Sequence, residues 1–225
     1  MSIGFFEAIK QGNRYEVERQ LIFNASLIHA RENGLSSVMS AAYHEQHEIA
    51  SFLASKTVAL TIFEAIAVGK LSNVVRLLAH DPDLVRSYSE DGFQPLGLAC
   101  YFGRFEVAQY LVKAGAPLNS TSHNELKVAP IQSAAAGGHE NIVKLLLANG
   151  ADPNIREHCG YTPLHAAAQN GDETMIRTLL YGGADMGLKG NDGKLPLDLA
   201  WEAGHKGATK LLEEGITKRF KSKWK

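Results

Sequence analysis

The chain contains little cysteine, no long apolar run and no excess of charge of either sign. Its 225 residues include only two cysteines, Cys100 and Cys159, and its formal net charge is −1. No apolar run reaches 18 residues, which argues against a transmembrane helix. The start, MSIGFFEAIKQGNR, lacks the basic and apolar regions of a secretory signal. These absences predict a protein of the reducing cytoplasm, and the balanced charge gives the chain as a whole no bias towards polyanions.

The stretch from Glu157 to Gly183, EHCGYTPLHAAAQNGDETMIRTLLYGG, predicts a pair of short helices. Thr162 is placed to cap the first helix, with its hydroxyl accepting from an N–H of the first turn. Pro163 follows at the first helical position, where a missing N–H costs nothing, and Gly171 ends the helix. Apolar residues between Met175 and Leu180 then recur at helical spacing. One such pair cannot bury its apolar face alone, so it needs neighbours stacked on both sides.

Thr162-Pro163-Leu164-His165-Ala166-Ala167 matches T-P-L-H-x-A, and the chain resembles the ankyrin-repeat family. The residue that ends each first helix gives the period. The spacings are 33, 24, 34, 35, 33 and 33, and the index positions are Gly12, Glu45, Gly69, Gly103, Gly138, Gly171 and Gly204. We therefore expect an all-α solenoid of about seven stacked helix pairs with short β-hairpins.

The boundaries of this array follow from the same positions. We expect the array to span residues 1–217, with a polar first repeat and a seventh repeat as end caps, followed by a basic tail, 218–225. The short spacing of 24 indicates that the hairpin between the second and third repeats is missing. Packing should continue across that point, with the first two repeats as one sub-block. The four hairpins are predicted near Ser89–Gly92, Asn119–Lys127, Asn154–Gly160 and Met186–Gly193.

Patterns that would carry chemistry are incomplete. His44-Glu45-Gln46-His47 brings the second histidine one residue too early for H-E-x-x-H. Gly193-Lys194-Leu195 lacks the Ser or Thr of a P-loop. His165 stands at the structural histidine of the motif, where a hydrogen-bonded core role is expected. Cys100 and Cys159, two repeats apart, are too distant for a disulfide. We expect no enzyme, no cofactor, no metal site and no small-molecule substrate.

The resemblance implies that partners bind the concave face, formed by hairpin tips and the exposed side of each first helix. We predict a site centred on the fourth to sixth repeats, because aromatic side chains concentrate at interface hot spots. The apolar anchors are Tyr88, Phe93, Tyr101 and Phe102, and the neighbouring polar part is Arg156, His158, Tyr161, Gln169 and Asn170. The alternative is that Phe93 and Phe102 pack locally against the hairpin.

Two functions remain open. The first is a monomeric scaffold that binds an unidentified partner protein without catalysis. The second is an adaptor whose tail contacts nucleic acid or an anionic membrane, because 218–225 carries five Lys or Arg with Phe220 and Trp224 between them. Without the tail the body has a net charge of −6, and the simplest alternative is that the tail is only solvated.

Overall fold

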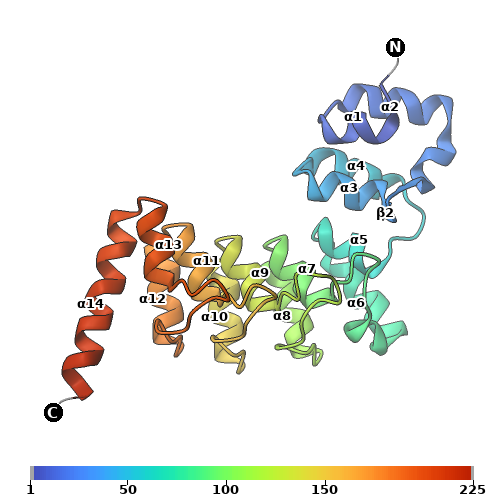
Figure 1. Ribbon diagram of the computed structural model, residues 1–225. Helices are drawn as coiled ribbons and strands as arrows, with labels where there is room; N and C mark the ends of the chain where they lie inside the picture. The colour runs from blue at the N-terminus through green and yellow to red at the C-terminus, as the bar shows by residue number, and fades with distance from the viewer. Residues whose placement is uncertain (1–2, 224–225) are drawn as a thin grey trace. The chain divides into compact units, whose positions relative to one another are not determined.

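The computed structural model describes the backbone of residues 3–223 and the side chains of residues 3–215. Within residues 3–223 it contains fourteen α-helices, two 3-10 helices and one pair of two-residue strands, which confirms the predicted all-α repeat class. The chain divides into two compact units, unit 1 (Met1–Pro95) and unit 2 (Leu96–Lys225). Figure 1 shows that the helices follow one another in short antiparallel pairs.

Unit 1 holds three helix pairs. Its elements are α1 (Phe5–Lys10), α2 (Arg14–Phe23), η1 (Ala25–His29), β1 (Arg31–Glu32), β2 (Leu35–Ser36), α3 (Ser37–Tyr43), α4 (His47–Lys56), α5 (Ile62–Ala67), α6 (Leu71–His80) and η2 (Pro82–Arg86). The strands β1 and β2 pair antiparallel, with Arg31 opposite Ser36. Asn33 and Gly34 at the tip both have positive φ, 51° and 83°, which is the backbone of a two-residue hairpin turn.

Unit 2 continues the series of pairs. Its elements are α7 (Pro95–Tyr101), which begins on the last residue of unit 1, α8 (Phe105–Lys113), α9 (Pro130–Ala136), α10 (Glu140–Ala148), α11 (Pro163–Gln169), α12 (Glu173–Tyr181), α13 (Pro196–Glu202) and α14 (Lys206–Lys223). Proline occupies the first turn of α9, α11 and α13, where its missing N–H leaves no bond unmade.

The turn inside each pair is fixed by a residue in the left-handed region. All seven index positions have φ between 58° and 76°. Six of them are glycine, which adopts this conformation without a Cβ clash. The seventh is Glu45, with φ 58°. Its Cβ crowds the backbone in this conformation, so the turn is strained at this position.

The pairs stack by placing like helices together. In unit 1, α1 packs on α3 and α3 on α5. In unit 2, α9 packs on α11 and α11 on α13, while α8, α10, α12 and α14 form a second row. Ala134, Ala135, Ala167 and Ala168 are buried, and their small side chains let the first helices approach closely. Larger side chains such as Leu164 are also fully buried, and each such residue stabilises the fold by about 1.5–3 kcal/mol.

A tight turn precedes most first helices, and we call each of these turns a finger. The fingers are 31–36 and 89–93 in unit 1, and 122–128, 157–161 and 190–194 in unit 2. The predicted list of hairpins was wrong in two respects. It omitted 31–36, which holds the strand pair of the described residues. Each of the other four has one backbone bond across its ends, such as Glu157 N to Tyr161 O, and one inside the turn, such as Gly160 N to Glu157 O, and none of them belongs to a strand of the described residues.

One finger is missing, as the short spacing predicted. Only residues 57–61 connect α4 to α5, and α3 nevertheless packs on α5, so packing continues across this point within unit 1. The division into compact units falls later than the expected sub-block boundary, at Pro95 and Leu96. The physical reason is that the α3–α5 contact holds the third pair to the first two.

Candidate functional site

A buried histidine links one helix pair of unit 2 to the next. His165 Nδ1 lies 3.1 Å from the backbone nitrogen of Thr162 and accepts its N–H, so Nε2 carries the proton and donates to the carbonyl oxygen of Lys194, 3.2 Å away. This confirms the expected core role of His165. Burial lowers the pKa of His165, because the charged imidazolium loses hydration. The neutral ring is therefore the form that the fold requires.

The predicted role of Thr162 is wrong in one detail. Its hydroxyl lies 2.9 Å from His165 Nδ1 and engages that nitrogen in place of an N–H of the first turn. The donor that is satisfied at the start of the helix is therefore the backbone N–H of Thr162, and the group that accepts it is the His165 side chain. One helix pair earlier, Gln132 does the same with an amide: its Oε1 accepts from Ala129 N at 2.9 Å, and its Nε2 donates to Tyr161 O at 3.0 Å.

Consecutive fingers of unit 2 are also joined directly. His158 N donates to Leu126 O at 3.1 Å, and Asn191 N donates to Cys159 O at 2.9 Å. The Asn191 side chain adds a bond from Nδ2 to His158 O at 3.0 Å. A finger in this unit therefore has its neighbour as a hydrogen-bonding partner.

Two residues of the predicted polar site hold neighbouring fingers in place. Arg156 is exposed and donates from Nη2 to Lys189 O at 2.6 Å. The Tyr161 hydroxyl donates to Asp192 at 2.7 Å, and this bond raises the pKa of Tyr161 to about 12. The Tyr161 ring stacks on His165 with centroids 4.8 Å apart. Tyr161 thus bonds to the 190–194 finger, and Arg156 bonds to Lys189, the residue just before that finger.

The other three members of the polar site, His158, Gln169 and Asn170, are exposed. Asn170 Nδ2 donates to Ala136 O at 2.9 Å, and the carbonyl of Gln169 accepts from His205 Nε2 at 3.0 Å. Unit 2 thus presents these polar groups on a surface that its own hydrogen bonds already order.

The predicted aromatic anchors fall two in each unit. In unit 2, Tyr101 is 45% exposed and its ring meets the half-buried Phe102 edge to face, with centroids 5.1 Å apart. In unit 1, Tyr88 and Phe93 are half-buried at the two ends of the 89–93 finger. The backbone of Phe93 bonds to Ser89 in both directions, through its N–H and its carbonyl.

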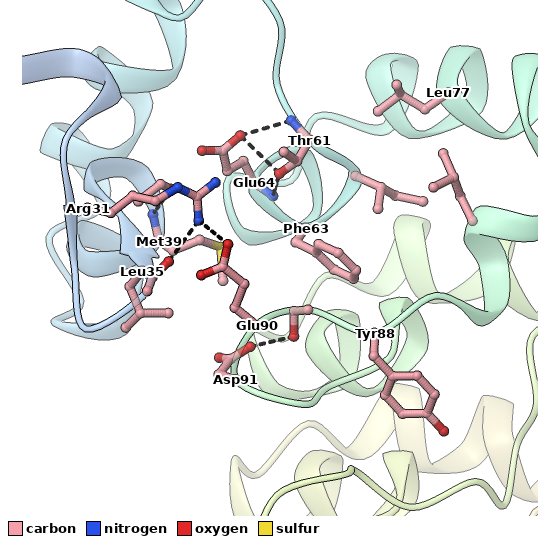
Figure 2. A pocket seen from close by; sticks show the side chains of 15 residues that line it. Arg31, Leu35, Met39, Thr61, Phe63, Glu64, Leu77, Tyr88, Glu90 and Asp91 are labelled. Atoms are coloured by element: carbon pink, nitrogen blue, oxygen red, sulfur yellow. Dashed lines mark hydrogen bonds and ion pairs between the residues drawn. The ribbon is translucent and has the colours of Figure 1, made fainter. Parts of the chain in front are cut away.

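Unit 1 contains a pocket of about 430 Å³ beside the 89–93 finger (Figure 2). Arg31 Nη1 donates to Glu90 at 2.6 Å, which bridges the 31–36 and 89–93 fingers, and also to Gly34 O at 2.8 Å. Leu35, Met39 and Phe63 supply apolar walls, and the buried Glu64 also lines the pocket.

Of the residues that line this pocket, the predicted site included Tyr88 and missed Arg31, Leu35, Met39, Phe63 and Glu64. The residues that it missed come from elements that are distant in the sequence from the 89–93 finger. The signal in the sequence that could have indicated this pocket was the spacing of 24 residues between Glu45 and Gly69. It shows that a finger is missing, and a missing finger leaves the side chains beside it uncovered.

Other candidate chemistry is not brought together. Among residues 3–223, no group of three His, Cys, Asp or Glu side chains could hold a metal ion, and no helix is long and apolar enough to cross a membrane. His44 follows α3 and bonds to Ser40 O, whereas His47 begins α4. Cys100 is buried and Cys159 is exposed, and both thiols are free. Burial raises the pKa of the Cys100 thiol well above its usual range.

The predicted basic tail is described only in part. The backbone of 218–223 belongs to α14, which extends beyond the predicted end of the array at residue 217. The tail side chains and residues 224–225 lie outside the described part of the chain, so the alternative based on them stays a prediction.

The sequence matches a family model described as "Ankyrin repeats (3 copies)" over residues 5–122, 62–157 and 131–222. Curated relatives also match. "Ankyrin repeat and SAM domain-containing protein 6" of Rattus norvegicus is 37% identical over 101 residues, which are 45% of this chain and 11% of that protein. "26S proteasome non-ATPase regulatory subunit 10" of Dictyostelium discoideum is 34% identical over 91 residues, 40% of this chain and 39% of that protein.

A third relative is "Putative E3 ubiquitin-protein ligase XBAT35" of Arabidopsis thaliana, 33% identical over 93 residues, 41% of this chain and 20% of that protein. The matched segment spans between about a tenth and two fifths of the length of these relatives.

Proposed function

Because the chain belongs to the ankyrin-repeat family, we propose that it is a non-catalytic scaffold that binds a partner protein on the face formed by its fingers and first helices. Ankyrin repeats generally mediate protein–protein interaction, and the family match covers nearly all of the chain. We further propose that the array comprises seven repeats. The support is that seven left-handed turn residues occur at the index positions, one inside each helix pair.

The observation that carries the proposal is the aromatic pair at the end of α7. Tyr101 is 45% exposed although its ring packs against Phe102. An aromatic ring that is held in place and still accessible loses little rotamer freedom on binding, and Tyr is enriched at interface hot spots. The anchors Tyr88 and Phe93 belong to the same proposal for unit 1.

The polar residues of unit 2 have a supporting role in the proposal. Arg156, Tyr161 and Asn170 each make a hydrogen bond within the unit. A surface that is ordered before binding has less conformational entropy to lose, which favours affinity. We also propose that the chain is a monomer and that it is located in the cytoplasm. The cytoplasmic location is supported by the two unpaired thiols, which are typical of proteins in a reducing compartment.

The test places a photo-crosslinking residue at position 101 of the full chain, with position 181 as the matched control. Tyr181 is 93% exposed at the end of α12 and lies outside the proposed face. We expect a protein that crosslinks from position 101 and not from position 181. Tyr101→Ala and Phe102→Ala should then weaken its binding tenfold or more, which is about 1.4 kcal/mol, whereas Tyr181→Ala should not. The proposal fails if the two variants unfold the chain while the folded fraction binds with the parent affinity.

A further inference from the structure

The pocket of unit 1 lies between the two fingers that flank the missing one. The 31–36 finger precedes the second helix pair and the 89–93 finger precedes the fourth, while the third pair follows the 57–61 connection directly. In unit 2, consecutive fingers bond backbone to backbone. Here side chains make the connection: Arg31 bonds to Glu90 (Figure 2), and Tyr43 bonds to Asp91.

The space left open has the size and lining of a binding site. Its volume of about 430 Å³ falls within the range of pockets that enclose ligands. Leu35, Met39 and Phe63 give it apolar walls. Met39 stands at the motif position that holds His165 in α11, where the side chain reaches the next finger. A thioether suits a position that has no following finger to bond.

Glu64 provides a polar group inside this pocket. It stands at the motif position of His165 and Gln132, and it is only 7% exposed. Its Oε2 accepts from the Thr61 N–H at 2.8 Å and from the Thr61 hydroxyl at 2.9 Å. Its Oε1 makes no hydrogen bond or ion pair with the described residues 3–215.

The difference from its counterparts is chemical. Gln132 and His165 each donate to a finger carbonyl with the half of the side chain that does not cap the helix. An ionised carboxylate can only accept. Among the described residues the only fully buried side-chain atom without a partner is Gln94 Oε1, so Glu64 Oε1 is open to the pocket, where a donor from outside unit 1 can reach it.

We propose that this pocket, which we call the vacant-finger slot, binds a turn of a partner protein that presents a lysine or arginine to Glu64. The charges favour such an occupant, since the slot is lined by Glu64, Glu90 and Asp91 against the single cation Arg31, which already pairs with Glu90. The turn would occupy the place of the missing finger. This site goes beyond the proposed function, because its recognising carboxylate, Glu64, is not among the nine residues of the proposed partner-binding face.

The experiment selects twelve-residue peptides from a random displayed library on the full chain. The soluble competitor is a variant that carries its own finger: a second copy of the nine residues Asp152–Gly160, inserted between Ala59 and Leu60. This choice places Gly160 before Leu60 and Thr61 as it stands before Tyr161 and Thr162. Peptides that bind elsewhere are removed by the competitor, so enrichment reports the slot.

We expect enriched peptides to carry Lys or Arg beside turn residues such as Gly, Asn or Asp. A synthetic copy of the strongest peptide should lose at least tenfold in affinity towards Glu64→Gln. That variant can still accept from Thr61 N, as Gln132 accepts from Ala129 N, so it should keep the parent melting temperature. The matched control is Glu48→Gln, an exposed carboxylate of unit 1 that does not line the slot, and it should bind like the parent.

Several outcomes would overturn the proposal. One is that every enriched peptide binds the finger-carrying variant as tightly as the parent; another is that the enriched peptides lack a basic residue. Equal binding to Glu64→Gln and the parent would remove the carboxylate from recognition. Self-association of the full chain that the inserted finger abolishes would put a second copy of the chain in the slot. If the inserted finger prevents folding, which circular dichroism reports, the Glu64→Gln and Glu48→Gln pair decides alone.

Discussion

His165 Nε2 donates to the carbonyl oxygen of Lys194 across 3.2 Å, and this bond ties the α11 helix to the finger before α13. Gln132 makes the equivalent bond to Tyr161 O at 3.0 Å. Two different side chains thus solve the same problem, which is to cap a helix with one atom and reach the next finger with another. What the position requires is an acceptor and a donor separated by the length of a planar group.

We predict that His165→Gln keeps most of the stability that His165→Ala loses. Alanine leaves the Thr162 N–H without its acceptor and removes one of two bonds to the Lys194 carbonyl, which still accepts from Gly190 N, and a loss of this kind costs about 1–3 kcal/mol. Thr162→Ala should cost about 1 kcal/mol, because it removes the bond between the Thr162 hydroxyl and His165 Nδ1. Urea denaturation of the three variants and the parent measures these differences. If the alanine variants share the midpoint of the parent, the motif is not structural.

Stability should fall below about pH 6.5, the ordinary pKa of histidine, and His165 should account for part of the fall. The folded-state pKa of His165 is lowered by burial, so the unfolded chain binds the proton more readily. Its contribution is therefore complete above pH ~6.5 and is lost as the pH falls towards the folded pKa. The measurement is the difference in urea midpoint between the parent and His165→Gln from pH 8 to pH 5. The other titrating groups are the same in both proteins, so their effects cancel in this difference. A flat difference would contradict the assignment.

Gly171→Ala should destabilise the array more than Gly204→Ala does. Both glycines have positive φ, 68° and 76°, so an alanine at either position pays about 1–2 kcal/mol of backbone strain. A Cβ at Gly171 would also lie 2.5 Å from the ring of His205, whereas nothing lies within 4 Å of one at Gly204. Equal shifts in the thermal midpoint of the two variants would show that the His205 ring moves aside without cost.

Glu45→Gly should stabilise unit 1. Glu45 is exposed and holds φ 58°, a conformation that glycine adopts without a clash. The expected gain is about 1 kcal/mol, reduced by the greater freedom of glycine in the unfolded chain. Thermal unfolding of the variant should show a raised midpoint. A lowered midpoint would mean that the Glu45 side chain contributes an interaction that outweighs its strain.

The helix pairs were predictable because their signals are local. Gly171 and its six counterparts fix the turn inside each pair, and the residues that set this turn lie within a few positions of it. The spacing also located the missing finger. It did not predict the strands at 31–36, because Asn33-Gly34 lies outside the repeated motif.

The site was less predictable because its contacts join residues about one repeat or more apart. Arg156 and Tyr161 were assigned to a partner, yet each bonds to a residue more than thirty positions later. The Arg31–Glu90 pair joins residues 59 positions apart, across the missing finger. No period in the sequence specifies which side chains meet at such a distance. The nine predicted partner-binding residues remain a prediction for the interface.

The unequal burial of the two thiols provides a natural handle for spectroscopy. Cys159 is exposed in the 157–161 finger, while Cys100 is buried and its raised pKa keeps it protonated. Because the thiolate is the reacting species, a maleimide dye added to the native chain should attach at the finger and spare the core. A fluorophore can therefore be placed next to His158 and Tyr161 without any substitution, and its emission would report a partner docking there.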